Sequence, residues 1–208
     1  MGMITIGERS IDSAELTARA RQVANGFEAI GLKPGDGVAL YLRNDIAFFE
    51  ATFGASAVGA YSIAVNWHCT TEEARYIFED SGAKVLVIHA DLLGPIRDAV
   101  PDSVEILVVE TPSEILDAYG IPAAQATVPD GLQSWAQWRD SFEATEREAI
   151  PAPSAIIYTS GTTGKPKGVK RPMPTPEQTA AAMAMLACSY GMTDLLATPE
   201  KITTAVVG

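Results

Sequence analysis

Apolar and polar positions along the chain alternate between two patterns, one typical of amphipathic helices and the other of buried strands. Residues 13–30 place apolar side chains at helical spacing, after a possible cap at Asp12 and before Gly31. Residues 37–42 are a short, uncharged and mainly apolar run, which predicts a buried strand. The same strand–helix order then recurs, as in chains with right-handed crossovers between parallel strands.

The pattern predicts the remaining elements in the same way. Further strands are expected at residues 61–65, 84–88, 104–109 and 154–158, and further helices at residues 46–58, 71–82, 91–99 and 134–142. Asn44 is the expected N-cap of the second helix, and Thr70 with Glu73 predicts a capping box for the third. We therefore expect an α/β fold with a mostly parallel sheet flanked by helices.

The segment from 111 to 152 is less regular and contains four prolines, and we interpret it as a segment that runs over the protein surface. Within it, Trp135 and Trp138 have i, i+3 spacing and are expected to pack in the core or under a lid. His68 beside Trp67 could line a ligand pocket, although a structural role is favoured, and His89 is interpreted as incidental.

The composition of the 208 residues, 47% hydrophobic and 20% charged, is that of a globular protein. The net charge of −11 and the pI near 4.6 argue against nucleic acid as a main partner, because duplex binding needs a broad basic face. No apolar run approaches the ~18 residues of a transmembrane segment. Since the start of the chain lacks a signal-peptide pattern, we expect a cytoplasmic protein.

Residues 158–169, YTSGTTGKPKGV, carry the most informative chemistry of the chain. They follow the strand expected at 154–158, and open α/β sheets bind ligands at the carboxyl ends of their strands. Glycines allow close backbone approach to an anion, hydroxyls add donors, and lysines add charge. The residues with these properties are Ser160, Gly161, Thr162, Thr163, Gly164, Lys165, Lys167 and Gly168.

The loop is not a P-loop of the Walker type, because Thr159 replaces its first glycine and Pro166 follows the lysine. Between residues 158 and 176 the chain has four basic residues, Lys165, Lys167, Lys170 and Arg171, and no acidic one. In a chain with 26 acidic and 15 basic residues, such a local concentration of positive charge predicts a polyanionic ligand.

These twelve residues resemble the signature loop of the AMP-binding, or adenylate-forming, superfamily of acyl-CoA synthetases, peptide-synthetase adenylation domains and luciferases. Residues 64–68 and 71–87 are similar to a segment of bacterial acyl-CoA synthetases, which favours that branch. One departure is Lys170-Arg171-Pro172, where family members often have a histidine.

The resemblance implies a two-step reaction. A carboxylate attacks the α-phosphorus of ATP and releases pyrophosphate with the help of Mg²⁺, and the thiol of coenzyme A then captures the acyl-adenylate. It also implies that Thr159, Ser160, Thr162 and Thr163 form hydrogen bonds to phosphate, that the glycines shape the loop, and that Lys165 and Lys167 supply charge, with Lys167 acting in catalysis.

The resemblance further implies that residues 1–175 are a first α/β sub-domain, and that residues 176–208 begin a second one with a helix at 177–190 and a strand at 201–207. We accordingly expect the N-terminal part of a fatty-acid or other carboxylic acid–CoA ligase, inactive alone and able to self-associate through its C-terminal end. The alternatives are a small phosphate- or nucleotide-binding module, an amino-acid adenylation domain fragment, and a phosphotransferase or NTPase. The last would use Asp45, Asp80 or Asp91 as base or metal ligand.

Overall fold

The computed structural model describes residues 2–148, 150, 153–159, 166–172 and 174–189. The strands are β1 (Met3–Ile6), β2 (Arg9–Asp12), β3 (Gly37–Tyr41), β4 (Tyr61–Ala64), β5 (Ala83–His89), β6 (Glu105–Val109), β7 (Gln133–Ser134), β8 (Ile156–Thr159) and β9 (Lys167–Gly168). The α-helices are α1 (Ser13–Ala29), α2 (Ile46–Ala57), α3 (Thr71–Ser81), α4 (Ala90–Ile96), α5 (Ser113–Tyr119), α6 (Trp135–Asp140) and α7 (Pro176–Ser189), and short 3₁₀ helices follow at Arg97–Ala99 and Ala123–Gln125.

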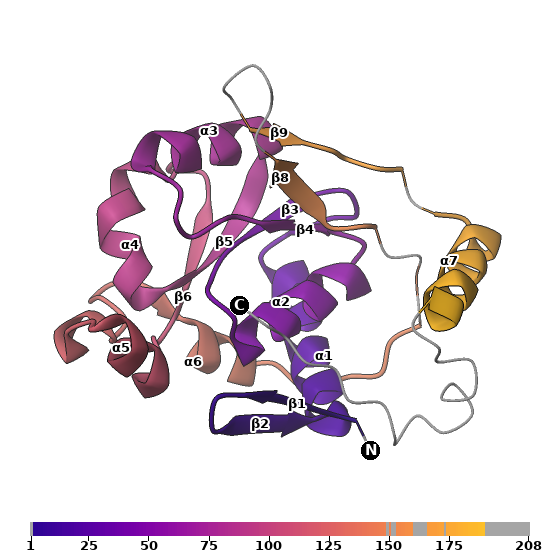
Figure 1. Ribbon diagram of the computed structural model, residues 1–208, viewed down its shortest axis with the longest axis horizontal. Coiled ribbons are helices and arrows are strands. Elements are labelled where there is room, and N and C mark those ends of the chain that lie inside the picture. The colour runs from indigo at the N-terminus through magenta and orange to yellow at the C-terminus, as the bar shows by residue number, and fades with distance from the viewer. Residues whose placement is uncertain (1, 149, 151–152, 160–165, 173, 190–208) are drawn as a thin grey trace.

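Seven of the strands form one sheet in the order β7-β6-β5-β3-β4-β8-β9 (Figure 1). All neighbours in this sheet run parallel except β8 and β9, which pair antiparallel at the edge. The predicted α/β fold with a mostly parallel sheet is therefore confirmed.

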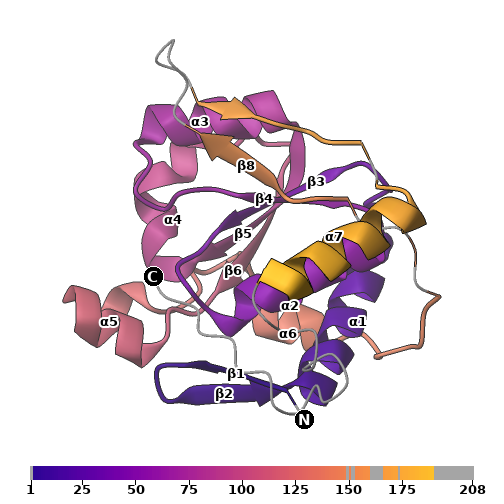
Figure 2. The same cartoon turned by 45° about the vertical axis from the view of Figure 1, so that its right-hand side comes forward.

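Helices cover both faces of the sheet, with α3 and α4 on one face and α1, α2 and α6 on the other (Figure 2). The central strands are buried on both faces, and all five residues of β3 are buried. This explains their apolar sequences, since a parallel strand between two helical layers has no solvent-facing side. Trp135 and Trp138 pack against Phe27 in the layer formed by α1 and α6, which confirms core packing for both indoles.

The helix caps agree with the sequence in two cases and differ in a third. Asp12 caps α1 by accepting hydrogen bonds from the backbone N–H groups of Ala14 and Glu15, and Thr70 and Glu73 form the expected capping box of α3. The N-cap of α2 is Asp45 rather than Asn44, and its Oδ1 accepts a hydrogen bond of 2.6 Å from the backbone N–H of Ile46. The prediction of Asn44 was therefore wrong. Arg9 of β2 and His89 of β5 hold the Asp45 carboxylate at the start of the helix, and local sequence does not show these distant contacts.

Several elements were not expected from the sequence. The hairpin of β1 and β2 lies apart from the main sheet, α5 and the two-residue strand β7 form within the segment interpreted as irregular, and β9 adds an edge strand (Figure 1). The strand expected at 201–207 lies outside the described residues, and the division at residue 175 stays a prediction. Within the described part of the chain, no helix is both long and apolar enough to cross a membrane.

Candidate functional site

The two ends of the predicted phosphate loop lie side by side at the carboxyl edge of the sheet. In the antiparallel pairing of β8 with β9, Tyr158 is opposite Gly168 and Thr159 is opposite Lys167. Lys167 is exposed, so its ammonium group can reach a ligand from solvent. The other predicted phosphate-binding residues lie outside the described residues: Ser160, Gly161, Thr162, Thr163, Gly164 and Lys165. Their roles, and those of Thr159 and Lys167, stay predictions.

Tyr158 fastens the start of this loop to α3. Its hydroxyl donates a hydrogen bond of 2.7 Å to Oδ2 of Asp80. Burial raises the pKa of the Tyr158 phenol, and the neighbouring Asp80 raises it further, so the hydroxyl stays protonated and remains a donor. On the facing strand, a Cβ atom at Gly168 would lie 2.7 Å from the Tyr158 ring. Position 168 therefore needs a glycine because the ring occupies the space of any side chain.

A pocket of about 290 Å³ adjoins the base of the loop. It lies between the end of β4, helix α3 and the loop, and it is lined by Asn66, His68, Cys69, Glu73, Ile77, Tyr158 and Pro166. His68 stacks on Trp67 with 3.4 Å between ring centroids. The location agrees with the suggestion that His68 lines a pocket, while its stacking contact is structural.

The basic residues after the loop do not share its location. Lys170 Nζ donates a hydrogen bond of 3.0 Å to the carbonyl of Gly35 and lies 4.5 Å from the centroid of the Tyr61 ring. The Tyr61 hydroxyl donates in turn to the carbonyl of Arg171 at 2.8 Å. Tyr61 is the first residue of β4 and Gly35 lies just before β3, so the Lys170 ammonium is held near the amino ends of these strands. The polyanionic ligand expected from the four basic residues stays a prediction.

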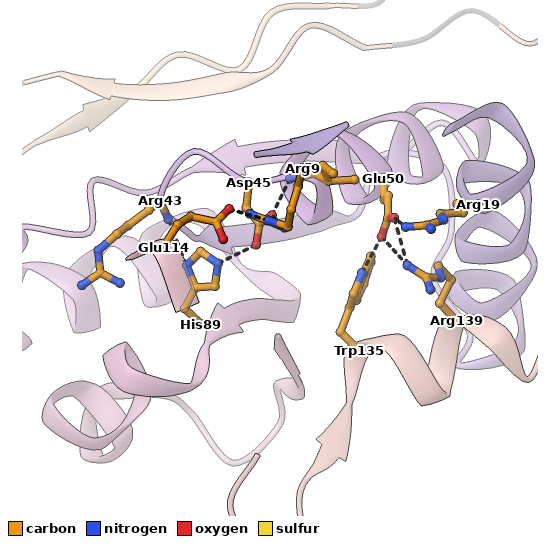
Figure 3. Close-up of polar contacts among 10 residues, drawn as sticks. Arg9, Arg19, Arg43, Asp45, Glu50, His89, Glu114, Trp135 and Arg139 are labelled. Carbon is orange, nitrogen blue, oxygen red and sulfur yellow. Dashed lines mark hydrogen bonds and ion pairs between the residues drawn. The ribbon is translucent and has the colours of Figure 1, made fainter. Parts of the chain in front are cut away.

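A second polar cluster lies at the carboxyl ends of β3 and β5, where Asp45 and His89 meet (Figure 3). His89 Nδ1 accepts a hydrogen bond of 3.2 Å from the backbone N–H of Arg43, and its Nε2 lies 2.9 Å from Oδ2 of Asp45. The other oxygen of Asp45 pairs with Arg9 at 2.7 Å. His89 is completely buried, so the reading of this residue as incidental was wrong.

These contacts affect the titration of Asp45. Burial alone would raise the pKa of this carboxyl group, but the hydrogen bond and charge of His89 and the guanidinium of Arg9 together lower it below its ordinary value. Asp45 is thus held as a carboxylate that joins the N-terminal hairpin to the sheet and caps α2.

Arg43 fills the neighbouring space. Its guanidinium pairs with Asp91 at 2.8 Å and lies 4.6 Å from the Trp67 ring and 4.8 Å from the Tyr119 ring. The hydroxyl of Thr111 donates to Asp91 at 2.7 Å. Open α/β sheets often bind ligands at the point where the strand order reverses, which in this sheet lies between β3 and β5. Here buried ion pairs occupy that point, which leaves the edge at β8 as the candidate ligand site.

Another pocket, of about 620 Å³, lies between the β1–β2 hairpin, α2 and α6. Glu50 at its wall is 1% exposed and accepts hydrogen bonds from Arg19, Trp135 and Arg139 (Figure 3). Because Arg19 and Arg139 pair with Glu50, and Arg9 pairs with Asp45 and Glu114, these side chains form a structural network rather than an anion site.

None of the three aspartates considered for a phosphotransferase is free. Asp45 and Asp91 bind arginines, and Asp80 binds Tyr158. Among the residues that the structure describes, no group of three His, Cys, Asp or Glu side chains could hold a metal ion.

Comparison with known proteins shows the family to which the chain belongs. The family model of the AMP-binding enzymes matches residues 4–198, which include the whole of residues 158–169. The chain belongs to the AMP-binding enzyme family. This result confirms the resemblance inferred from the loop, and the described main sheet lies within the matched residues.

Similar proteins in this family are ligases that activate carboxylic acids. The fatty acid–[acyl-carrier-protein] ligase ScoC of Streptomyces coeruleorubidus is 32% identical over 165 residues, covering 77% of this chain and 28% of that protein. The crotonobetaine/carnitine–CoA ligase of Citrobacter koseri is also 32% identical over 165 residues, which cover 77% of this chain and 30% of that ligase. The chain thus spans less than a third of the length of these relatives.

The fold is also that of solved ligases. The anthranilate CoA ligase AuaEII, crystallised in complex with anthranoyl-AMP, superposes with a TM-score of 0.68 at 25% identity. The superposition covers 82% of this chain and 31% of the ligase. The sheet and its flanking helices therefore correspond to part of a larger adenylate-forming enzyme.

Proposed function

We propose that this AMP-binding chain supplies the pyrophosphate-binding part of an ATP-dependent carboxylic acid–CoA ligase. The proposal is carried by one observation, the pairing of Tyr158 and Thr159 at the carboxyl end of β8 with Gly168 and Lys167, which brings the two ends of the loop sequence together with Lys167 exposed. In the proposed reaction a carboxylate attacks the α-phosphorus of ATP, pyrophosphate leaves, and the acyl-adenylate reacts with a thiol to give a thioester.

The loop acts on the leaving pyrophosphate. Lys167 and Lys165 offset negative charge that builds on the β- and γ-phosphates, while Thr159, Ser160, Thr162 and Thr163 donate hydrogen bonds and the glycines let the backbone approach. Lys167 is the proposed catalytic residue because its positive charge stabilises the negative charge that develops on pyrophosphate as the bond between the α-phosphorus and the bridging oxygen breaks. Mg²⁺ would arrive with the nucleotide, and we assign it no protein ligand and no step.

Substrate and thiol are proposed only by class. The relatives include ligases for fatty acids and for carnitine derivatives, and one of them is named for an acyl-carrier protein rather than coenzyme A. We propose a fatty acid or another carboxylic acid as substrate, coenzyme A as the thiol, and the cytoplasm as the compartment. The proposed sub-domain boundary at residue 175, the absence of turnover by the chain alone and its self-association belong to the same proposal.

Binding of tripolyphosphate and ATP to this chain, measured by calorimetry, tests the proposal. We expect similar and weak affinities for both, near millimolar or about −4 kcal/mol, because the loop holds phosphates rather than the base. Lys167→Ala should weaken both about 10-fold, the effect of one charge-assisted hydrogen bond. The matched control is Lys33→Ala, an exposed lysine before β3 that should have no effect.

Two results would contradict this function. One is the absence of tripolyphosphate binding at about ten times the expected dissociation constant. The other is unchanged binding by the Lys167→Ala variant. In a form of the protein that carries out adenylation, the same substitution should lower carboxylate-dependent pyrophosphate exchange on the order of 10²-fold.

A further inference from the structure

Tyr158 stands where the sheet ends and the phosphate loop begins. Strand β8 pairs with β4 only through Ile156 and Ile157, since their partners Ile63 and Ala64 are the last two residues of β4. From Tyr158 onward, the described chain forms no strand pairing on the side that faces β4. On its other side it pairs with the two-residue strand β9, which lies at the sheet edge. The start of the loop thus projects past its main neighbour.

The hydrogen bond from Tyr158 to Asp80 supplies a second attachment at this point. The two residues are 78 positions apart in the sequence, and the bond of 2.7 Å joins the projecting end of β8 to the last turn of α3. On the facing strand, Gly168 lies so close to the Tyr158 ring that a Cβ there would collide with it. The phenol is therefore confined between α3 and β9.

Helix α3 is well suited to serve as the fixed support. Its N-terminus carries the capping box of Thr70 and Glu73, and its C-cap is Gly82 in the left-handed conformation with φ 60°. Ala74, Ile77 and Phe78 bury its inner face against the sheet. Asp80 thus projects from a helix that is fixed at both ends and along one side.

We propose that Tyr158 and Asp80 are positioning residues for the phosphate loop: their hydrogen bond holds the first residue of the loop against α3 and so orients the segment that binds the pyrophosphate of the nucleotide. This inference rests on the proposed function, because it gives the pair a purpose only if the loop binds phosphate. The raised pKa of the Tyr158 phenol supports it, since the hydroxyl donates to the carboxylate throughout the neutral range.

The test compares tripolyphosphate binding and urea unfolding for variants of both partners. Tyr158→Phe keeps the ring that faces Gly168 and removes only the hydroxyl, and Asp80→Ala removes the acceptor from an exposed helix position. Each should weaken tripolyphosphate binding about 3- to 10-fold, the effect of one hydrogen bond. The double variant should bind no more weakly than either single variant, because both changes break the same contact.

Further variants separate positioning from a merely structural role. Tyr76→Phe is the matched control, since its hydroxyl lies at the longer distance of 3.4 Å from the other oxygen of Asp80, and it should leave binding unchanged. Asp80→Asn keeps an acceptor oxygen and should recover part of the affinity that Asp80→Ala loses. If the role were only structural, urea midpoints would fall while affinity for tripolyphosphate stayed constant.

The outcomes distinguish this inference from the function on which it rests. The proposed function and the inference both fail if the unaltered chain does not bind tripolyphosphate. They also both fail if Lys167→Ala binds tripolyphosphate with the same affinity as the unaltered chain. If Lys167→Ala weakens binding while Tyr158→Phe and Asp80→Ala bind like the unaltered chain, the inference alone is overturned. Additive losses in the double variant would also overturn it, because they would show that the two residues act separately.

Discussion

Replacing Glu50 with alanine should be among the most damaging single changes in this fold. Its carboxylate is 1% exposed and lies at the contact between α1, α2 and α6. Trp135 Nε1 donates to it at 2.8 Å, Arg139 Nη1 lies 2.9 Å from both of its oxygens, and Arg19 Nη1 lies 3.0 Å from one. Alanine would leave a buried guanidinium and a buried indole N–H without this acceptor.

The magnitude follows from which partners are buried. Arg19 is about a third exposed, so water replaces much of its lost contact and its share is below about 1 kcal/mol. The Arg139 side chain is 10% exposed and keeps only its bond to Asp140, which is itself mostly exposed. Removing one partner of a buried pair costs about 3–5 kcal/mol, a large part of the roughly 5–15 kcal/mol that stabilises a typical domain.

Urea unfolding followed by tryptophan fluorescence measures this loss directly, since Trp135 is one of the partners. With a slope of about 2 kcal/mol per molar urea, the midpoint of Glu50→Ala should fall by roughly 2 M. Glu50→Gln should fall less because it keeps an acceptor for the indole. Glu15→Ala, which removes only the exposed ion pair with Arg19, should lose under about 1 kcal/mol. A loss below about 1 kcal/mol for Glu50→Ala would refute the reasoning.

Two further predictions concern pH and helix capping. Because the pKa of Asp45 is lowered in the fold, its contribution to stability is complete above its ordinary pKa of about 3.9 and is lost as the pH falls through the lower folded value. The unfolding free energy of Asp45→Asn should therefore decrease less between pH 7 and pH 3 than that of the unaltered chain. Urea unfolding at the two pH values measures this, and an equal decrease in both proteins would contradict the prediction. Thr70→Ala should cost about 1 kcal/mol by removing the capping box of α3, and a urea midpoint equal to that of the unaltered chain would show that the cap contributes nothing.

The sequence by itself determined the order of the main elements and the α/β class, because both depend on local periodicity. A strand buried on both faces must be apolar throughout, as β3 is, and an amphipathic helix must repeat its apolar side chains, as α1 does. The capping box at Thr70 was equally visible, since its two partners are three residues apart. The family was also evident from the sequence, because residues 158–169 form one continuous motif.

Only the tertiary structure decided which polar side chains meet. His89 pairs with Asp45 across 44 positions, Lys170 reaches Gly35 across 135, and Tyr158 binds Asp80 across 78. A spacing of that kind has no periodic signature, because the sheet brings strands together in the order β5-β3-β4-β8 rather than in sequence order. Lys170 follows Lys167 closely in the sequence, but β9 runs antiparallel to β8, and the Lys170 ammonium contacts Gly35 and Tyr61 near the amino ends of β3 and β4. Strand direction and strand order, which local patterns do not encode, therefore decided the composition of the candidate site.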